Sequence, residues 1–302
     1  KYYKTADYRS KDKVNENRDI QLTKKQEKDR IIALLTIFAI VIFFWMIYYQ
    51  NGFTLTLFAK NYTLTHVGKF TFLLFDPVPL FSLIAIALGL IVVFNKSVGK
   101  KAKIWSIAAI VIAALIVIYK LNTLPNSNHI SPELFQSFNP LFIVFLTPII
   151  VGFFAWFHKR KKEPSTPGKM GIAMIITAFA YLIMILASYS IAKISTPGYS
   201  NMLRVTPYWL ISTYFVMTVA ELFLSPMGLS FVSKVAPPRM KGLMMGGWFV
   251  ASAIGSYLSG FIGRFYQEWQ IWQFFLLLLI TSLLSAGLVR IFLKRLRSAT
   301  EN

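Results

Sequence analysis

The chain has 302 residues, of which 56% are hydrophobic, and its mean hydropathy of +0.56 is too apolar for a soluble domain of this length. Its formal net charge of +20 comes from bases in short segments between apolar runs, which is typical of membrane loops and argues against nucleic-acid binding. Cysteine is absent, which excludes disulfides, thiolate metal sites and cysteine nucleophiles.

The chain opens on a polar, strongly charged segment, residues 1–30, which has no apolar period long enough to fold alone. We predict a cytoplasmic connector here and a transmembrane bundle over residues 31–302. The first residue is Lys1 rather than Met, and no secretory signal pattern follows it. We therefore expect the chain to be part of a longer polypeptide.

The apolar runs predict eight membrane-spanning helices, most of which reach the length of about 20 residues that a bilayer core requires. They cover residues 31–57, 78–94, 104–121, 134–157, 170–192, 208–232, 243–262 and 271–293. The second and third runs are shorter. They could form a tilted hairpin, an interfacial pair, or spans whose flanking lysines reach the membrane surface.

Basic residues predict the orientation of the spans. With eight spans, 26 of the 32 Lys and Arg residues fall on one side of the membrane. The positive-inside rule then places both termini in the cytoplasm. Omitting both short runs leaves the parity unchanged, so this count does not distinguish eight spans from six.

Polar residues in the first and fourth runs allow two interpretations each. Trp45, Tyr48 and Tyr49 in the first run are either membrane-interface aromatics or part of a cavity. Asn139, followed by Pro140, either caps a helix or faces a substrate. From the residues alone we favour capping, because Asn before Pro is a common helix start.

Glu221 is the only acidic residue deep inside a long apolar run. A carboxylate at bilayer depth costs about 2.5–3.5 kcal/mol on insertion scales, so it is expected to face a cavity or a partner. Polar and small residues recur around it at spacings of three and four, which places them on one helix face. These residues are Tyr214, Thr218, Glu221, Ser225 and Gly228.

The seventh run carries small residues at four-residue intervals, which predicts a close-packing face in lipid. This face comprises Gly242, Gly246, Ser252, Ser256 and Gly260, together with Trp248. Trp248 is too bulky for that face. It is either an anchor at the membrane interface or part of a cavity wall.

Histidine does not indicate a catalytic or metal centre. His66, His129 and His158 lie outside the apolar runs or at their edges, and no carboxylate stands at ligand spacing. We therefore predict no metal site. A Ser/His/Asp hydrolase, or any other membrane-embedded enzyme, is equally unsupported.

These residues together resemble the carboxyl-terminal half of the proton-coupled oligopeptide transporter family, within the major facilitator superfamily. The resemblance covers most of the chain from Ile31 to the end. The matching segments are, in chain order, Phe44-Trp45 (seventh helix of the family), Gln136-Ser-Phe-Asn-Pro (eighth), Pro164-Ser-Thr-Pro (the loop after it), Glu221-Leu-Phe-Leu-Ser-Pro-Met-Gly (tenth) and Trp248 with the Gly-Gly pair before it (eleventh).

The resemblance implies an all-α fold, half of a major facilitator bundle, with six core helices and an extra hairpin at residues 78–121. That hairpin is a departure, because the family usually has a short loop between its seventh and eighth helices. The implied function is the carboxyl-terminal half of an importer of di- and tripeptides in the bacterial inner membrane. It would work by alternating access, with protons as the coupling ion and no other cofactor. The implied partners are the peptide, the lipid bilayer and an amino-terminal six-helix bundle of the same transporter.

The resemblance also implies roles for individual residues. Glu221 would bind the amino group of the peptide, Asn139 its backbone, and Trp248 with Ser252 its side chains, while Trp45 lines the same cavity. A second departure is Tyr49, which stands where the family usually has a carboxylate implicated in proton coupling. Since tyrosine has a reference pKa of about 10, we expect Glu221 to carry more of the coupling.

Two alternatives remain open from the sequence. A half-bundle does not fix the cargo, so the substrate could be nitrate or a drug. The chain could also be a non-transporting membrane scaffold or receptor, if the polar face of the sixth run meets lipid or partner helices.

Overall fold

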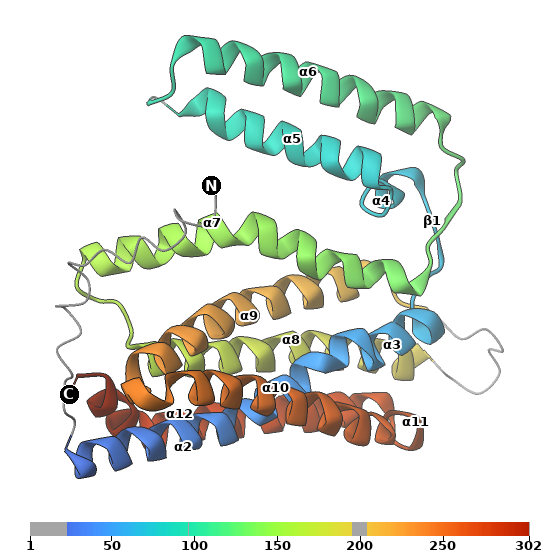
Figure 1. The fold of residues 1–302 in the computed structure, drawn as a ribbon. Coiled ribbons are helices and arrows are strands. Elements are labelled where there is room, and N and C mark those ends of the chain that lie inside the picture. The colour runs from blue at the N-terminus through green and yellow to red at the C-terminus, as the bar shows by residue number, and fades with distance from the viewer. Residues whose placement is uncertain (1–22, 96, 195–203, 302) are drawn as a thin grey trace, which may run out of the picture.

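The computed structural model describes residues 23–95, 97–194 and 204–301, and these form an almost entirely helical protein (Figure 1). The helices are α2 (Lys24–Tyr48), α3 (Thr54–Tyr62), α4 (Lys69–Phe72), α5 (Pro77–Phe94), α6 (Lys100–Thr123), α7 (Phe138–Lys159), α8 (Thr166–Ile194), α9 (Tyr208–Val235), α10 (Lys241–Gly263), α11 (Phe265–Glu268) and α12 (Ile271–Glu301). Short 3-10 helices are η2 (Tyr49–Gly52), η3 (Pro132–Ser137) and η4 (Pro238–Met240). Strands β1 (His66–Val67) and β2 (Asn128–His129) complete the described part of the chain.

Eight segments of the described chain are long and apolar enough to cross a membrane, which confirms the eight predicted spans. The first runs from Lys24 to Tyr62 and includes the breaks around η2. Its start differs from the prediction, because α2 begins seven residues before Ile31. Thr23 accepts a hydrogen bond from the Gln26 amide, and the Gln26 side chain accepts one from the Thr23 amide. This capping box allows the charged residues 24–30 to join the helix. Residues 1–22 of the predicted connector lie outside the described residues.

The first span is interrupted at η2, which the apolar pattern did not predict. The Ile47 carbonyl accepts a hydrogen bond from the Tyr181 hydroxyl at 2.8 Å, and the Asn51 carbonyl accepts one from the Tyr214 hydroxyl at 2.6 Å. The Gln50 side chain is buried and donates to the Ser259 carbonyl at 2.9 Å. A broken helix is tolerated at membrane depth only where neighbouring groups satisfy the freed backbone. Here hydroxyls of α8 and α9 bond to the freed carbonyls, and the Gln50 side chain links the break to α10.

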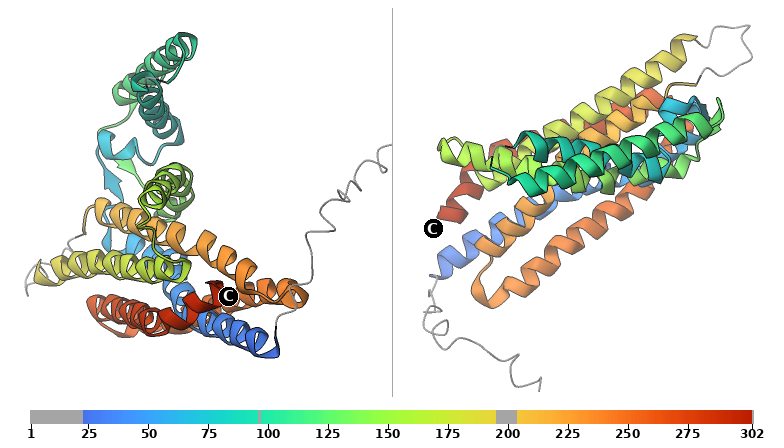
Figure 2. Two further views of the ribbon diagram at one scale, coloured as in Figure 1. Left: turned by 90° about the vertical axis from the view of Figure 1, so that its left-hand side faces the viewer. Right: turned by 90° about the horizontal axis from the view of Figure 1, so that it is seen from above.

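Six of the spans form a bundle in which the helices run roughly along a common direction (Figures 1 and 2). Helix α8 packs between α9 and α12, and α2 packs against both α10 and α12. Helix α7 packs mainly on α9. Helices α2 and α9 each bury eleven or more residues, among them several aromatic side chains.

The close-packing face of α10 differs from the predicted one. An added Cβ at Gly255 would lie 2.5 Å from the Trp45 Cβ, and one at Gly247 would lie 2.7 Å from the Phe38 ring. Gly242, Gly246 and Gly260 meet no described atom within 4 Å. The face of α10 that packs on α2 is therefore not the predicted one. Both sets of small residues repeat every four positions, and only the set containing Gly247 and Gly255 faces α2.

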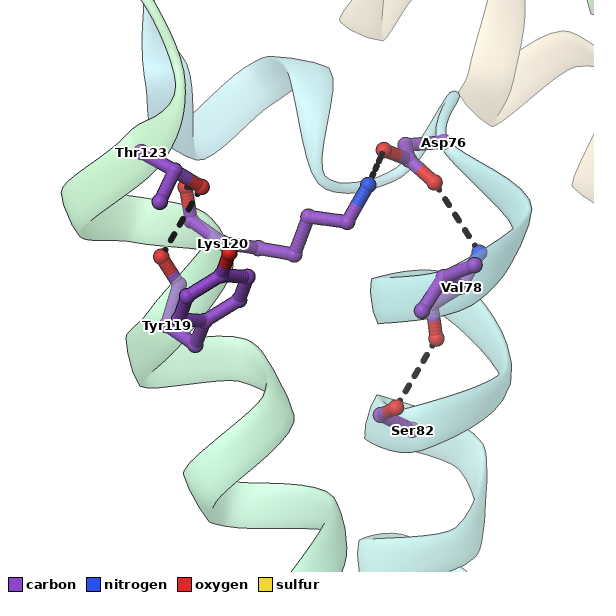
Figure 3. Close-up of polar contacts among 6 residues, drawn as sticks. All are labelled: Asp76, Val78, Ser82, Tyr119, Lys120 and Thr123. Atoms are coloured by element: carbon purple, nitrogen blue, oxygen red, sulfur yellow. Dashed lines mark hydrogen bonds and ion pairs between the residues drawn. The ribbon is translucent and has the colours of Figure 1, made fainter.

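The α5–α6 hairpin stands apart from the bundle, beyond α7 (Figure 2). Its helices pack on each other where Gly89 allows a close approach, since an added Cβ there would lie 2.6 Å from Ile110. At the opposite end from the tip, Asp76 caps α5 by accepting from the Val78 amide at 3.0 Å, and its other oxygen accepts from Lys120 at 2.7 Å (Figure 3). One carboxylate thus starts α5 and ties it to the end of α6.

Candidate functional site

The carboxylate of Glu221 lies at the midpoint of α9 and contacts two other helices. Its Oε2 accepts a hydrogen bond from the Tyr48 hydroxyl of α2 at 2.6 Å and from the Asn139 amide of α7 at 2.9 Å. Within the described residues both of these bonds are on Oε2, and the side chain is only partly buried. Hydrogen bonds from neutral donors to an ionised group are about twice as strong as bonds between neutral groups. Glu221 therefore joins three helices through one oxygen atom.

Asn139 does not cap a helix, so the capping interpretation of Asn139-Pro140 was wrong. Helix α7 begins at Phe138, and Ser137 occupies the cap position without a side-chain hydrogen bond. The amide of Asn139 instead donates to Glu221 and, at 3.1 Å, to the Thr218 hydroxyl. Proline at the following position costs no hydrogen bond, because amides in the first turn of a helix have no internal partner.

The polar face of α9 lies toward α2, α7 and α10. Tyr214 contacts the broken segment of the first span, Thr218 and Glu221 contact α7, and Gly228 lies against α10. This face therefore meets protein, as the helical spacing of these residues predicted.

Trp45 and Tyr49 lie in the interior, so the membrane-interface interpretation of this aromatic patch was wrong. Trp45 is 7% exposed, and its ring stacks on Tyr49 with centroids 5.5 Å apart. The Tyr49 hydroxyl lies 2.9 Å from the Ser252 hydroxyl on α10. The Trp45 Nε1 is buried and has no hydrogen-bond partner in the described part of the chain. A buried unpaired donor is costly, so this nitrogen is an unusual feature of the packing around Tyr49.

Trp248 fills the space between α9 and α10 and is not an interface anchor. It is 2% exposed, and its ring lies where a side chain at position 228 would otherwise be. Phe38 packs against it edge to face, with centroids 6.5 Å apart. The ring sets the spacing of two helices that carry proposed site residues, Glu221 and Ser252.

Tyr48 is the site residue that the sequence did not single out. It occupies the position before Tyr49 in the same aromatic patch, and spacing alone does not show which of the two faces α9. The spacing could have indicated its position, because Tyr48 follows Phe44 by one helical turn and so lies on the same buried face. The two rings stack with centroids 5.8 Å apart. Phe44 is 1% exposed, so an interior position for Tyr48 follows.

A second charged cluster lies in the loop between α7 and α8. Glu163 accepts a hydrogen bond from the buried Lys169, and its other oxygen lies 2.7 Å from the His158 Nδ1. The bond from Lys169 holds the pKa of Glu163 below its ordinary value, with His158 adding to the effect and burial opposing it. The Lys169 ammonium also lies 4.1 Å from the centre of the Phe154 ring. This cluster fastens the Pro164–Pro167 loop to the bundle.

Metal-binding groups do not accompany the candidate site. Within residues 23–95, 97–194 and 204–301, no group of three or more His, Cys, Asp or Glu side chains is placed to hold a metal ion. The site as described consists of one carboxylate, hydroxyl and amide groups, and aromatic rings.

Comparison with known proteins places the chain in a family. Residues 112–275, which are more than half of the chain, match the model of the POT family. A peptide transporter of Yersinia enterocolitica is 36% identical over 129 residues, 43% of this chain and 24% of that protein. A di-/tripeptide transporter of Lactococcus lactis subsp. cremoris is 32% identical over 169 residues, 55% of this chain and 31% of that protein.

The fold also resembles solved structures. The crystal structure of a peptide transporter POT in complex with sulfate superposes with a TM-score of 0.64 and 21% identity, covering 94% of this chain and 44% of that one. The chain thus spans less than half the length of the transporters that it matches. From the extent of the family match, the chain belongs to the POT family, whose members are multi-pass membrane peptide transporters of the major facilitator superfamily rather than enzymes.

Proposed function

We propose that the chain is the carboxyl-terminal half of a secondary transporter that imports di- and tripeptides together with protons by alternating access. The observation that carries the proposal is the Glu221 carboxylate, which meets side chains of α2 and α7 at the midpoint of α9. A charge at this depth is expensive unless a ligand or partner makes use of it. In major facilitator proteins, substrate sites lie near the membrane midplane.

The proposed ligand of Glu221 is the ammonium group of a peptide. Within the described residues both hydrogen bonds to this carboxylate are on Oε2, so an ammonium can bind Oε1 while Tyr48 and Asn139 hold Oε2. The Asn139 side chain would also contact the peptide backbone through its Oδ1, because its Nδ2 already donates to Glu221 and Thr218. The Trp45 ring would line the same cavity.

The proposed side-chain pocket involves Tyr49, Ser252 and Trp248. The hydroxyls of Tyr49 and Ser252 lie 2.9 Å apart and bridge α2 and α10. Trp248 packs beside this region, with its ring in contact with Gly228 and Phe38. Its role would then be to position α10 rather than to touch the peptide directly.

Glu221 is also the proposed proton carrier. Tyr49 stands where the family usually has a carboxylate and, with a reference pKa of about 10, is unsuited to titrate near neutral pH. Glu221 would then be the residue at which the binding of a proton and the binding of a peptide influence each other.

The proposed partner is an amino-terminal six-helix bundle of the same transporter, packed against α7 and α10. Support comes from a groove that Gly242, Gly246 and Val250 of α10 line together with Leu35 of α2. Small residues let a helix of another bundle approach closely, whereas lipid chains have no such requirement. Both termini of this segment would be cytoplasmic, in the inner membrane of a bacterium.

The α5–α6 hairpin is proposed as an insertion between the first two core helices of the half-bundle. Both of its helices are apolar and mostly exposed, as expected for helices surrounded by lipid. Because it adds an even number of crossings, the helices after it keep their orientation. The domain division of residues 1–30, 31–302 and the 78–121 insertion is part of this proposal.

Uptake by the complete transporter in proteoliposomes tests the proposal. In Glu221→Gln, proton-driven dipeptide uptake is expected to stop, while exchange of labelled for unlabelled dipeptide continues because the amide still binds the peptide. Glu133→Gln makes the same chemical change at an exposed residue outside the site and should leave both activities intact. Loss of exchange as well would assign Glu221 to binding alone, and wild-type uptake in Glu221→Gln would reject the proposed site.

Two other functions would give different results. If the cargo is nitrate or a drug, unlabelled dipeptide would not compete with its uptake. If the chain is a scaffold or receptor, cysteines placed at Tyr214, Thr218 and Ser225 would not react with a water-soluble thiol reagent. The absence of native cysteine makes this labelling free of background.

A further inference from the structure

Two histidines face each other at the base of the α5–α6 hairpin. Strands β1 and β2 pair antiparallel, with His66 opposite His129 and Val67 opposite Asn128. β1 leads into the hairpin from α3, and β2 leads out of it toward α7. The two strands are therefore the neck through which the hairpin joins the bundle. The pairing of these two strands is sufficient to bring the two imidazole rings together.

The strand register places the two side chains at the closest kind of cross-strand position. The Ile130 amide donates to the Thr65 carbonyl at 2.7 Å, which makes that pair a hydrogen-bonded one. The adjacent pair, His66 and His129, is then a non-hydrogen-bonded pair, in which opposite Cβ atoms come nearest. Both histidines are exposed, whereas Val67 on the other face is buried. The imidazoles thus share the open face of the ribbon.

We propose that His66 and His129 form a binding site for a divalent transition metal ion such as Zn²⁺. Zinc lies about 2.0–2.1 Å from an imidazole nitrogen and so about 3.2 Å from the ring centre, and two rings at the tetrahedral angle of about 109° then have centres about 5.2 Å apart. The observed centroid separation is 5.2 Å. Because both side chains are exposed, they can turn about their side-chain torsions to direct one nitrogen each at a common ion.

The coordination sphere identifies the class of ion. The described residues supply two nitrogen ligands and no third His, Cys, Asp or Glu that completes a metal-binding group. Water would fill the remaining positions, as it fills the open position of catalytic zinc sites. Imidazole suits Zn²⁺, Cu²⁺ and Ni²⁺, whereas Ca²⁺ and Mg²⁺ require oxygen ligands. The two imidazoles would therefore favour these transition metal ions over Ca²⁺ and Mg²⁺, and the bound ion would be exchangeable.

Metal binding here would lock the neck of the hairpin. The two ligands come from strands separated by the whole of α4, α5 and α6, so one ion would cross-link the entry and exit of the hairpin. A metal clip that closes a long loop restricts the unfolded chain most. This proposal departs from the prediction of no metal site made from the sequence. There, 62 positions separate the two histidines, and only the strand pairing brings them together.

Titration calorimetry on the full chain in detergent, purified without a histidine tag, tests the proposal. With Zn²⁺ as the probe, we expect one ion per chain, and no heat of binding with Ca²⁺. His66→Ala and His129→Phe each remove one ligand, and the phenylalanine retains the ring that packs on its neighbour. Loss of an outer partner of a metal ligand costs about 10–100-fold in affinity, so loss of a ligand should weaken Zn²⁺ binding at least that much.

His158→Ala is the matched control, because His158 is the third histidine of the chain and lies in the α7–α8 loop. It should bind Zn²⁺ as the wild type does. Equal unfolding temperatures of the variants without metal will show that each is folded. Absence of Zn²⁺ binding by the wild type, wild-type affinity in His129→Phe, or loss of binding in His158→Ala would each overturn the proposal and leave the ring pair as a packing contact only.

Discussion

Replacing Gly228 with alanine tests whether the ring of Trp248 sets the spacing between α9 and α10. The added Cβ would lie 1.9 Å from Cη2 of Trp248 and 2.4 Å from Cζ2. The ring is 2% exposed, with Phe38 against its edge, so it has little space into which to move. Overpacking costs about 1–3 kcal/mol, while alanine in place of glycine in a helix gains about 1 kcal/mol. Since several ring atoms overlap, we expect a net loss of about 2 kcal/mol.

Thermal unfolding of the purified full chain measures this loss. For domains of this general size, 1 kcal/mol corresponds to about 2–4 °C, so Gly228→Ala should unfold about 4–8 °C below the wild type. Gly287→Ala on α12 is the matched control, because no described atom lies within 4 Å of its added Cβ. Its unfolding temperature should stay level or rise.

A double variant identifies the cause of the loss. Trp248→Phe shortens the ring that occupies the space beside position 228. In Gly228→Ala combined with Trp248→Phe, the total loss should be smaller than the sum of the two single losses. If Gly228→Ala unfolds at or above the wild-type temperature, or if the two losses simply add, contact between these residues does not set the helix spacing.

The remaining predictions concern two carboxylates. Tyr48→Phe removes one hydrogen-bond donor from Glu221. Because a hydrogen bond to a charged group contributes about 1.5–3 kcal/mol, dipeptide exchange should weaken roughly 10- to 100-fold, while the unfolding temperature changes little. Unchanged exchange would show that this bond does not organise the site. Glu163→Gln leaves the buried Lys169 without its ion partner, and we expect a loss of about 1–3 kcal/mol at pH 7. The pKa of Glu163 is lowered in the folded state, so its stabilisation is present above the unfolded value of about 4.3 and is lost as the pH falls through the folded value. The difference in unfolding temperature between Glu163→Gln and wild type should therefore persist from pH 7 to about pH 5 and shrink as the pH falls below about 4.3. A difference that stays constant at lower pH would contradict this account.

The spans could be predicted from the sequence because the bilayer imposes a length on apolar runs, and most runs met that length without help from their neighbours. The break at Tyr49–Gly52 could not be predicted. It depends on hydroxyls of Tyr181 and Tyr214, which reach the first span only after α8 and α9 have packed beside it. Tertiary hydrogen bonds of this kind leave no local signature.

The candidate site was partly predictable for similar reasons. Glu221 could be identified from the sequence because a buried charge is expensive, and its polar neighbours share one helical face. Asn139 carries a strong local capping signal, which the more distant carboxylate overrides. The stripe of small residues on α10 failed as a guide because two faces of that helix carry glycines at the same interval, and only the position of α2 distinguishes them.

The pairing of Glu221 with its own neighbours has a consequence for turnover. Tyr48 and Asn139 both bond to Oε2, so the carboxylate keeps one orientation whether or not a peptide ammonium occupies Oε1. The entropy cost of ordering this side chain then falls on folding and not on each binding event. A carrier repeats binding and release in every cycle, so a carboxylate held in place by its own helices would meet each new peptide without a further rearrangement.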